Sequence, residues 1–216
     1  MIKNIVFDIG GVIVPLNRLA CIRAFDRLMN YRDIALMLST YRRKGYFEKF
    51  ELGQLSPSKF RYVIRTNAFT SQDDRTKIYS DDLIDDCLNR YLGDIPQDKI
   101  DALNFFKYEY KLYVLSNANP IGMKRVEELF ENMGYKMDEI FEKQFLSYKM
   151  GLIKPDLKIF NVMQKKAKIK PEETLFIDDS PANIKAANSL GYHTILYNNK
   201  ENLYDTIYQF FERQQW

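Results

Sequence analysis

The sequence has few of the residues on which several common kinds of functional site depend. Its 216 residues include 2 cysteines, 1 histidine and 1 tryptophan. Cys21 and Cys87 lie far apart and form no CxxC pair, so we expect free thiols in a reducing compartment rather than a disulfide framework or a zinc site. The histidine, His193, begins an expected strand and gives no support to a Ser-His-Asp triad.

Long apolar runs and nucleotide-binding loops are missing as well. No run approaches the ~18 apolar residues that a membrane-spanning helix needs, and Asp8 interrupts the apolar start too early for a signal peptide. There is no GxxxxGKS or GxxxxGKT loop, and no GxGxxG follows a strand. The net charge is +3, charges of both signs are interspersed, and no basic stretch exceeds residues 42–44. We therefore predict a cytoplasmic protein that binds neither membranes nor nucleic acid.

What the chain does contain is typical of a folded α/β protein. With 46% hydrophobic and 28% charged residues, it is long enough for one large domain or for a core with an inserted subdomain. Five short apolar runs are typical of buried strands: residues 5–7, 112–115, 144–146, 175–177 and 194–197. Helical patterns accompany the later runs: residues 121–133, 157–167, 181–190 and 203–211. This alternation predicts a parallel sheet of about five strands with right-handed crossovers.

Residues 17–92 show no strand pattern and are expected to form a small helical bundle inserted between the first and second strands. The first helix is expected to bury a face formed by Leu19, Ile22, Phe25 and Leu28. The second begins at its N-cap Ser56, and the third spans residues 81–92. The core would then consist of the remaining segments, residues 1–16 and 93–216.

Two segments follow expected strands in the first half of the pattern. Asp8 comes directly after a buried strand, where a carboxylate can bind a metal or attack an electrophile, and Gly10 and Gly11 let the backbone approach an ion or a phosphate. Ser116 and the amide of Asn117 follow the second strand and could hold phosphate oxygens. The alternatives are an Asp that forms a turn and a Ser-Asn pair that caps the next helix.

Two further segments carry charge in the second half of the chain. Lys154 could neutralise a phosphate and the carboxylate of a nucleophile, although a lone lysine is usually a solvated surface residue. Asp178 and Asp179 end a very apolar strand, where two carboxylates are unfavourable unless a cation compensates them. Mg²⁺ is the natural candidate, and the alternative is a doubled Asp that caps the helix at Pro181.

In the order Asp, Ser, Lys, Asp-Asp, these segments resemble the four motifs of the haloacid dehalogenase (HAD) superfamily. The resemblance extends over residues 6–197 and is most specific from residue 151 to residue 191. Residues 47–56, followed by Phe60, are similar to the helical cap of the small-cap phosphatases in that superfamily. The resemblance implies a Rossmann-like core with a helical cap over the site.

The resemblance implies a Mg²⁺-dependent phosphatase of a small phosphorylated metabolite, such as a sugar phosphate or a nucleotide. Asp8 would attack phosphorus and form an aspartyl-phosphate. Mg²⁺ would be held by Asp8, the Gly10 carbonyl and Asp179, with Asp178 helping directly or through water. The phosphoryl oxygens would be bound by three residues: Ser116, Asn117 and Lys154.

One position departs from the pattern of the superfamily. Phosphatases that it resembles usually carry a second Asp two residues after the nucleophile as general acid and base, and this chain has Gly10 there. Such help is typically worth ~10²–10⁴-fold. We favour a substrate with a good leaving group, or a proton from the cap or from water, because some sugar-1-phosphate phosphatases of the superfamily share the Asp-x-Gly pattern.

Two alternatives to a phosphatase stay open. The first is a different chemistry of the same superfamily, by a phosphonate hydrolase or a dehalogenase. A phosphonate hydrolase would need a cap lysine, for which Lys44, Lys49 and Lys59 are available. A dehalogenase would not need the Asp178-Asp179 pair. The other alternative is a catalytically weak binding or regulatory protein that keeps the pocket. A monomer and a homodimer are both compatible with the aromatic C-terminal tail, residues 203–216.

Overall fold

The computed structural model describes residues 1–31, 34–37, 45–70 and 79–213. Lys44, named above as a possible cap lysine, and the end of the aromatic tail lie outside these residues. A five-stranded parallel sheet has the order β3-β2-β1-β4-β5. Its strands are β1 (Asn4–Phe7), β2 (Lys111–Ser116), β3 (Lys143–Leu146), β4 (Thr174–Asp178) and β5 (His193–Leu196). The predicted α/β fold with about five parallel strands is confirmed.

The strand register places the polar ends of neighbouring strands along one edge of the sheet. Phe7 in the central strand β1 pairs with Val114 of β2 and with Ile177 of β4. Asp8, which follows Phe7, therefore lies between the ends of β2 and β4. Because ligands of open parallel sheets bind outside the carboxyl ends of the strands, this edge is the expected position of a site.

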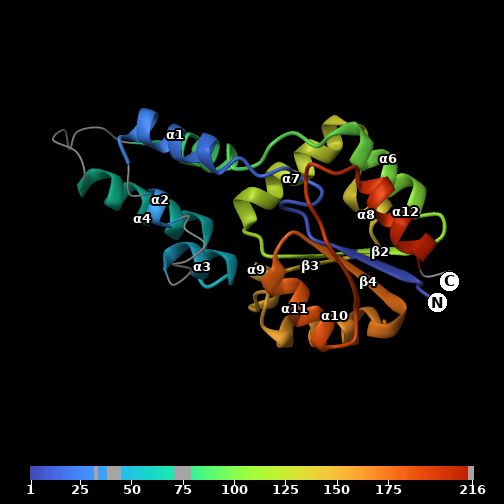
Figure 1. Ribbon diagram of the computed structural model, residues 1–216. Helices are drawn as coiled ribbons and strands as arrows, with labels where there is room; N and C mark the ends of the chain where they lie inside the picture. The colour runs from blue at the N-terminus through green and yellow to red at the C-terminus, as the bar shows by residue number, and fades with distance from the viewer. Residues whose placement is uncertain (32–33, 38–44, 71–78, 214–216) are drawn as a thin grey trace.

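Helices cover both faces of the sheet (Figure 1). One face carries α6 (Gln97–Phe106), α7 (Pro120–Asn132), α8 (Met137–Ile140) and α12 (Leu203–Arg213). The other face carries α10 (Leu157–Ala167) and α11 (Pro181–Ser189). Two short helical elements complete the core: α9 (Ser147–Met150) and the 3-10 turn η2 (Pro171–Glu173).

The alternation of side chains along β1 explains the two layers. Ile5 and Phe7 are fully buried against the α6, α7 and α12 side, and Val6 is fully buried against the α10 and α11 side. Successive residues of a strand point to opposite faces, so a run that is apolar throughout needs cover on both sides. Each such side chain contributes roughly 1.5–3 kcal/mol when it is fully buried.

The inserted helices, α1 to α5, form a separate group beside the sheet (Figure 1). They are α1 (Arg18–Met29), α2 (Ile34–Met37), α3 (Tyr46–Glu51), α4 (Pro57–Thr70) and α5 (Asp81–Asn89). Most of their buried side chains form one apolar cluster, which includes the free thiols of Cys21 and Cys87 and extends to Ile121 of α7. Ser56 caps α4 as predicted, since its hydroxyl accepts a hydrogen bond from the Lys59 amide at 3.2 Å.

The buried face of α1 differs from the prediction. Phe25 is fully buried as predicted and Ile22 is half-buried, whereas Leu19 and Leu28 are 62% and 41% exposed. The helix buries Cys21, Ala24 and Met29 beside Phe25. Both sets have helical spacing, so periodicity alone does not choose between them. Packing against α5 selects the second set.

Two short segments connect the inserted helices to the sheet and pair with each other. The Asn17 amide donates to the Tyr91 carbonyl at 2.7 Å, and the Gly93 amide donates to the Pro15 carbonyl at 2.8 Å. This pairing explains why α5 ends at Asn89 rather than at the predicted residue 92, because the chain beyond it is extended beside residues 15–17.

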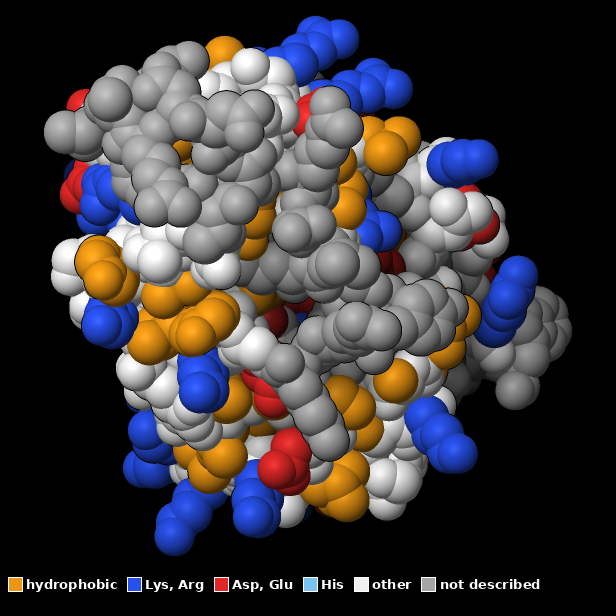
Figure 2. Space-filling model, turned by 90° about the vertical axis from the view of Figure 1, so that its left-hand side faces the viewer, with side chains coloured by type: hydrophobic (Ala, Val, Ile, Leu, Met, Phe, Trp, Pro, Cys, Tyr) orange, Lys and Arg blue, Asp and Glu red, His pale blue; other side chains and the backbone are white. Residues whose placement is uncertain are grey.

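Among the described residues, no helix is both long and apolar enough to cross a bilayer. Among the described residues on the face shown in Figure 2, lysine and arginine side chains are spread over the surface and do not gather in one patch.

Lys99 is a buried cation beneath the loop that follows β1. Lys99 lies on α6 and is only 2% exposed. Its ammonium group donates to the Val12 carbonyl and to Asn199 Oδ1. It also lies 5.2 Å from the centroid of the Tyr197 ring. Burial lowers the pKa of Lys99 from 10.5 to about 8. Lys99 thus ties the loop after β1 to the loop after β5.

We expect Lys99→Met to lower the free energy of unfolding by about 1–3 kcal/mol at pH 7, because it leaves the buried Val12 carbonyl without this donor. The folded pKa lies below the unfolded value, so the unfolded chain binds more protons between pH 8 and 10.5. The contribution of Lys99 to stability therefore rises with pH over that interval. In urea unfolding at pH 7.5 and pH 10, the difference in the free energy of unfolding between wild type and Lys99→Met should be larger at pH 10.

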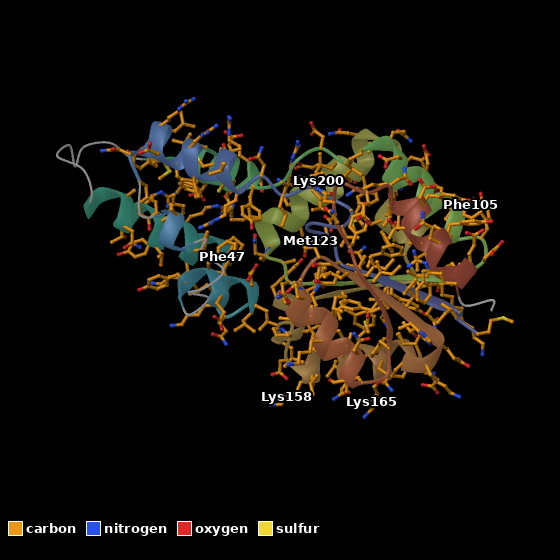
Figure 3. All side chains as sticks on the ribbon, in the orientation of Figure 1. Phe47, Phe105, Met123, Lys158, Lys165 and Lys200 are labelled. Carbon is orange, nitrogen blue, oxygen red and sulfur yellow. The ribbon has the colours of Figure 1, made fainter. Side chains whose placement is uncertain are left out.

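The control for this experiment is Lys165→Met, which removes an exposed lysine from α10 (Figure 3). We expect its stability to follow that of wild type at both pH values. A gap between wild type and Lys99→Met that narrows as the pH rises would contradict the assigned sign.

Candidate active site

Three carboxylates meet at the carboxyl edge of the sheet. Asp8 follows β1, Asp178 ends β4, and Asp179 comes next in the chain. One carboxylate oxygen of each lies within 4.8 Å of the others. Asp178 is fully buried, Asp8 is 8% exposed, and Asp179 is exposed. The group therefore reaches from the interior of the protein to its surface.

Lys154 lies between two of these carboxylates and is 1% exposed. Its Nζ atom lies 2.6 Å from Asp178 Oδ2, 3.0 Å from Asp8 Oδ2 and 2.7 Å from the Leu115 carbonyl oxygen. An ammonium group has three protons to donate, and these three acceptors account for all of them. Lys154 is thus a fixed cation that connects the ends of β1, β2 and β4.

The carboxylate of Asp178 is held in place on both oxygens. Oδ1 accepts from the Ser180 amide at 2.8 Å and from Asn183 Nδ2 at 2.9 Å, and Oδ2 accepts from Lys154. Asn183, in the first turn of α11, is a site residue that the sequence motifs do not predict. Its position five residues after Asp178, on the helix that the Asp pair precedes, was the signal available.

Asp179 lies against the loop that follows β1. Gly11 has a φ of +79°, and a Cβ atom at this position would overlap the carboxylate of Asp179. Glycine is required here both for the backbone conformation and for the close approach. The second Asp of the pair therefore faces Gly11 and Asp8 with an exposed carboxylate, whereas Asp178 is held from within.

The segment after β2 adds two polar residues to the site. Ser116 is 2% exposed, and its hydroxyl donates a hydrogen bond to Asp8 that lowers the pKa of the carboxyl. The side chain of Asn117 brackets the backbone of Lys154: Nδ2 donates to the Lys154 carbonyl at 3.0 Å, and Oδ1 accepts from the Lys154 amide at 2.8 Å. This use of the Asn117 side chain was not anticipated, and the role of its amide toward phosphate stays a prediction.

Gly10 stands where a second acidic residue would project. A Cβ atom there would lie 3.2 Å from Leu16 Cδ2, so the space beside Gly10 is taken by the side chain of Leu16. Leu16 belongs to the segment that leads into the inserted helices, and it is 40% exposed. An apolar side chain thus occupies this side of the site. The Gly10 carbonyl as a metal ligand stays a prediction.

The site carries more negative than positive charge. Three carboxylates and one ammonium group leave a formal excess of two negative charges among these four residues. Burial raises the pKa of Asp8 to about 7, with Asp178 adding to the effect and Lys154 opposing it. Burial by itself lowers the pKa of Lys154, but Asp8 and Asp178 together raise it, so the ammonium stays charged.

This donor set fits a divalent cation. Mg²⁺ prefers a few carboxylate oxygens and keeps part of its coordination for water and phosphate. It would balance the formal negative charge of these four residues, and Asp8 and the exposed Asp179 are the carboxylates on the surface side of the group. The structure thus brings together five of the predicted site residues: Asp8, Ser116, Lys154, Asp178 and Asp179.

Comparisons with known proteins agree with this arrangement. Residues 2–191 match the model of the haloacid dehalogenase-like hydrolase family. The chain is 32% identical over 198 residues to the D-ribitol-5-phosphate phosphatase of Bacteroides thetaiotaomicron, covering 90% of this chain and 91% of the relative.

Two solved structures are similar over nearly the whole chain. One is an aspartate-to-alanine mutant of a HAD family enzyme from Bacteroides thetaiotaomicron in complex with magnesium and inorganic phosphate. It has a TM-score of 0.88 and 36% identity, over 96% of this chain and 99% of that one. The other is a HAD-like family hydrolase from Porphyromonas gingivalis, with a TM-score of 0.87 and 36% identity over 98% of each chain. The chain belongs to the haloacid dehalogenase-like hydrolase family.

Proposed function

We propose that the protein is a Mg²⁺-dependent phosphatase that hydrolyses a small sugar or polyol phosphate through an aspartyl-phosphate on Asp8. The observation that carries this proposal is the meeting of Asp8, Lys154, Asp178 and Asp179 at the carboxyl edge of the sheet, where one carboxylate oxygen of each Asp lies within 4.8 Å of the others. The similarity to a D-ribitol-5-phosphate phosphatase and to a structure with magnesium and inorganic phosphate supports the same chemistry.

The mechanism follows from how Asp8 is held. Its Oδ1 atom accepts from the Ile9 amide at 2.7 Å and its Oδ2 atom lies 3.0 Å from Lys154 Nζ, so the carboxylate has a fixed orientation. An Asp8 oxygen forms a bond to phosphorus while the ester P–O bond breaks, and water then cleaves the aspartyl-phosphate to release inorganic phosphate. With phosphate bound, Lys154 and Ser116 exchange their contacts with Asp8 for phosphoryl oxygens and neutralise or hold them during both steps. Bound Mg²⁺ supplies further neutralisation of the phosphoryl charge.

Gly10 and Leu16 determine how the leaving group departs. Gly10 has no side chain and that of Leu16 cannot donate a proton, so the leaving oxygen takes its proton from water or from a residue of the cap. We infer that hydrolysis slows as the leaving group becomes more basic, because general acid help is typically worth ~10²–10⁴-fold.

We assign residues 1–16 and 93–216 to the catalytic core and residues 17–92 to a cap that covers the site. The apolar cluster that most of the buried side chains of the inserted helices share, and the paired connecting segments, support this division. The two buried free thiols support a cytoplasmic location.

The test is release of inorganic phosphate from ribitol 5-phosphate, hexose 1- and 6-phosphates and p-nitrophenyl phosphate, with Mg²⁺ and with a chelator. We expect turnover that the chelator abolishes. We also expect the hexose 1-phosphates and the aryl ester to be hydrolysed faster than primary alkyl esters of equal affinity, because Gly10 provides no general acid for a poor leaving group. Absence of release from every ester, in folded protein with Mg²⁺, would overturn the proposal. Release of halide from 2-chloropropionate without metal would indicate a dehalogenase.

A further inference from the structure

The hydroxyl group of Ser147 connects the inserted helices to the core. Ser147 begins α9 directly after β3, at the same edge of the sheet as Asp8, and is fully buried. Its Oγ atom accepts from the Ala118 amide at 2.9 Å. The same atom lies 2.6 Å from the Glu51 carbonyl oxygen and 3.1 Å from the Ala118 carbonyl oxygen. Since a hydroxyl has one proton, the shorter contact identifies Glu51 as its acceptor.

The turn after α3 rests on the backbone of α9 beside this hydroxyl. Gly53 has a φ of +68°, and a Cβ atom there would overlap the Tyr148 carbonyl oxygen. The Gly53 amide donates to the Phe50 carbonyl at 3.0 Å, and the Phe50 ring stacks on Phe60 of α4 with centroids 4.2 Å apart. The turn is therefore rigid and meets α9 at a distance that only glycine permits.

The other partner of Ser147 belongs to the phosphate-binding loop, residues 116–119. This loop is anchored at two points. The Asn117 side chain holds the backbone of Lys154, and the Ala118 amide is held by Ser147. One hydroxyl thus joins segments that lie 29 and 96 residues away from it in the sequence.

We infer that Ser147 is a positioning residue that couples the seating of the inserted helices to the geometry of the phosphate-binding loop. With α3 seated, the Ser147 proton goes to Glu51 and a lone pair of Oγ faces the Ala118 amide. When α3 lifts, the remaining acceptor within reach is the Ala118 carbonyl, and the hydroxyl turns away from the amide that it held. The role of the loop in this inference rests on the proposed function, whereas the coupling itself does not.

The coupling is tested with Gly53→Ala, Ser147→Ala and the double variant, in the full chain. The readouts are the affinity for inorganic phosphate with Mg²⁺, measured by calorimetry, and hydrogen exchange of the Ala118 amide, measured by NMR. We expect each single variant to weaken phosphate binding roughly 3- to 10-fold, the effect of one hydrogen bond. Each should also accelerate hydrogen exchange of the Ala118 amide. The double variant should bind phosphate with an affinity no lower than that of the single variant with the lower affinity.

Gly134→Ala is the matched control. Gly134 has a φ of +83° and nothing within 4 Å of a Cβ atom, so this variant reports backbone strain alone. Additive effects on phosphate binding, or Ala118 exchange in Gly53→Ala equal to that in Gly134→Ala, would overturn the inference. A wild type that neither binds phosphate nor hydrolyses any ester would instead overturn the proposed function, and the exchange rates would still decide the coupling.

Discussion

Replacement of Asp8 by Asn is expected to lower kcat by ~10⁴-fold or more, as removal of a nucleophile does in enzymes that form a covalent intermediate. Asn has nearly the same shape as Asp, so the fold around β1 should be retained. The amide nitrogen cannot attack phosphorus, and the lost negative charge weakens the attraction for a divalent cation. Both effects act on turnover and neither is expected to alter the sheet.

The measurement is phosphate release at saturating Mg²⁺, with far-UV circular dichroism to check folding. Asp138→Asn is the control, because Asp138 is an exposed carboxylate on α8. We expect wild-type turnover from the control. Turnover by Asp8→Asn within tenfold of wild type would exclude Asp8 as the nucleophile and direct attention to a water that attacks phosphorus directly.

Lys154→Met is expected to have the largest combined effect on stability and activity. It leaves the buried carboxylates of Asp8 and Asp178 without their ammonium partner, a change that typically destabilises a protein by about 3–5 kcal/mol. Turnover should fall by ~10²–10³-fold or more, because a preorganised positive charge at the phosphoryl group is lost.

The pH dependence of this variant has a definite sign. Burial already raises the folded-state pKa of Asp8 to about 7. Removal of Lys154 raises it further, because the charge of Lys154 opposes the shift. A carboxyl with a folded pKa above its unfolded value destabilises the protein above that pKa and does so less as the pH falls through it. Wild-type Asp8 is itself protonated below about pH 7, so metal-free Lys154→Met should approach wild-type stability as the pH falls from 8 to 7, and below that the two stabilities should change in parallel.

Thermal unfolding across this pH range, with and without Mg²⁺, measures the effect. Lys158→Met removes an exposed lysine from the first turns of α10, on the outer edge of the molecule (Figure 3), and is expected to leave stability unchanged. A Lys154→Met protein as stable as wild type at pH 8 without metal would show that the two carboxylates do not need this cation.

The local sequence was sufficient to identify the strands, the later helices and most of the polar residues at the site. Asp8, Ser116 and Asp178-Asp179 each end or follow an apolar run, and polar residues at such positions emerge at one edge of a parallel sheet. Lys154 was identifiable through its place in the motif order, although its burial was not. Local order therefore determined the fold class and the candidate chemistry.

The tertiary structure decided which residues act on one another. Strand order places β1 between β2 and β4, so that Lys154 reaches both Asp8 and Asp178. The buried face of α1, the position of Leu16 beside Gly10 and the Ser147 hydroxyl between Ala118 and Glu51 depend on packing between distant segments. Periodicity records which side of one element is apolar, but it carries no information on the partner that covers that side, and for this reason only the folded chain determines these contacts.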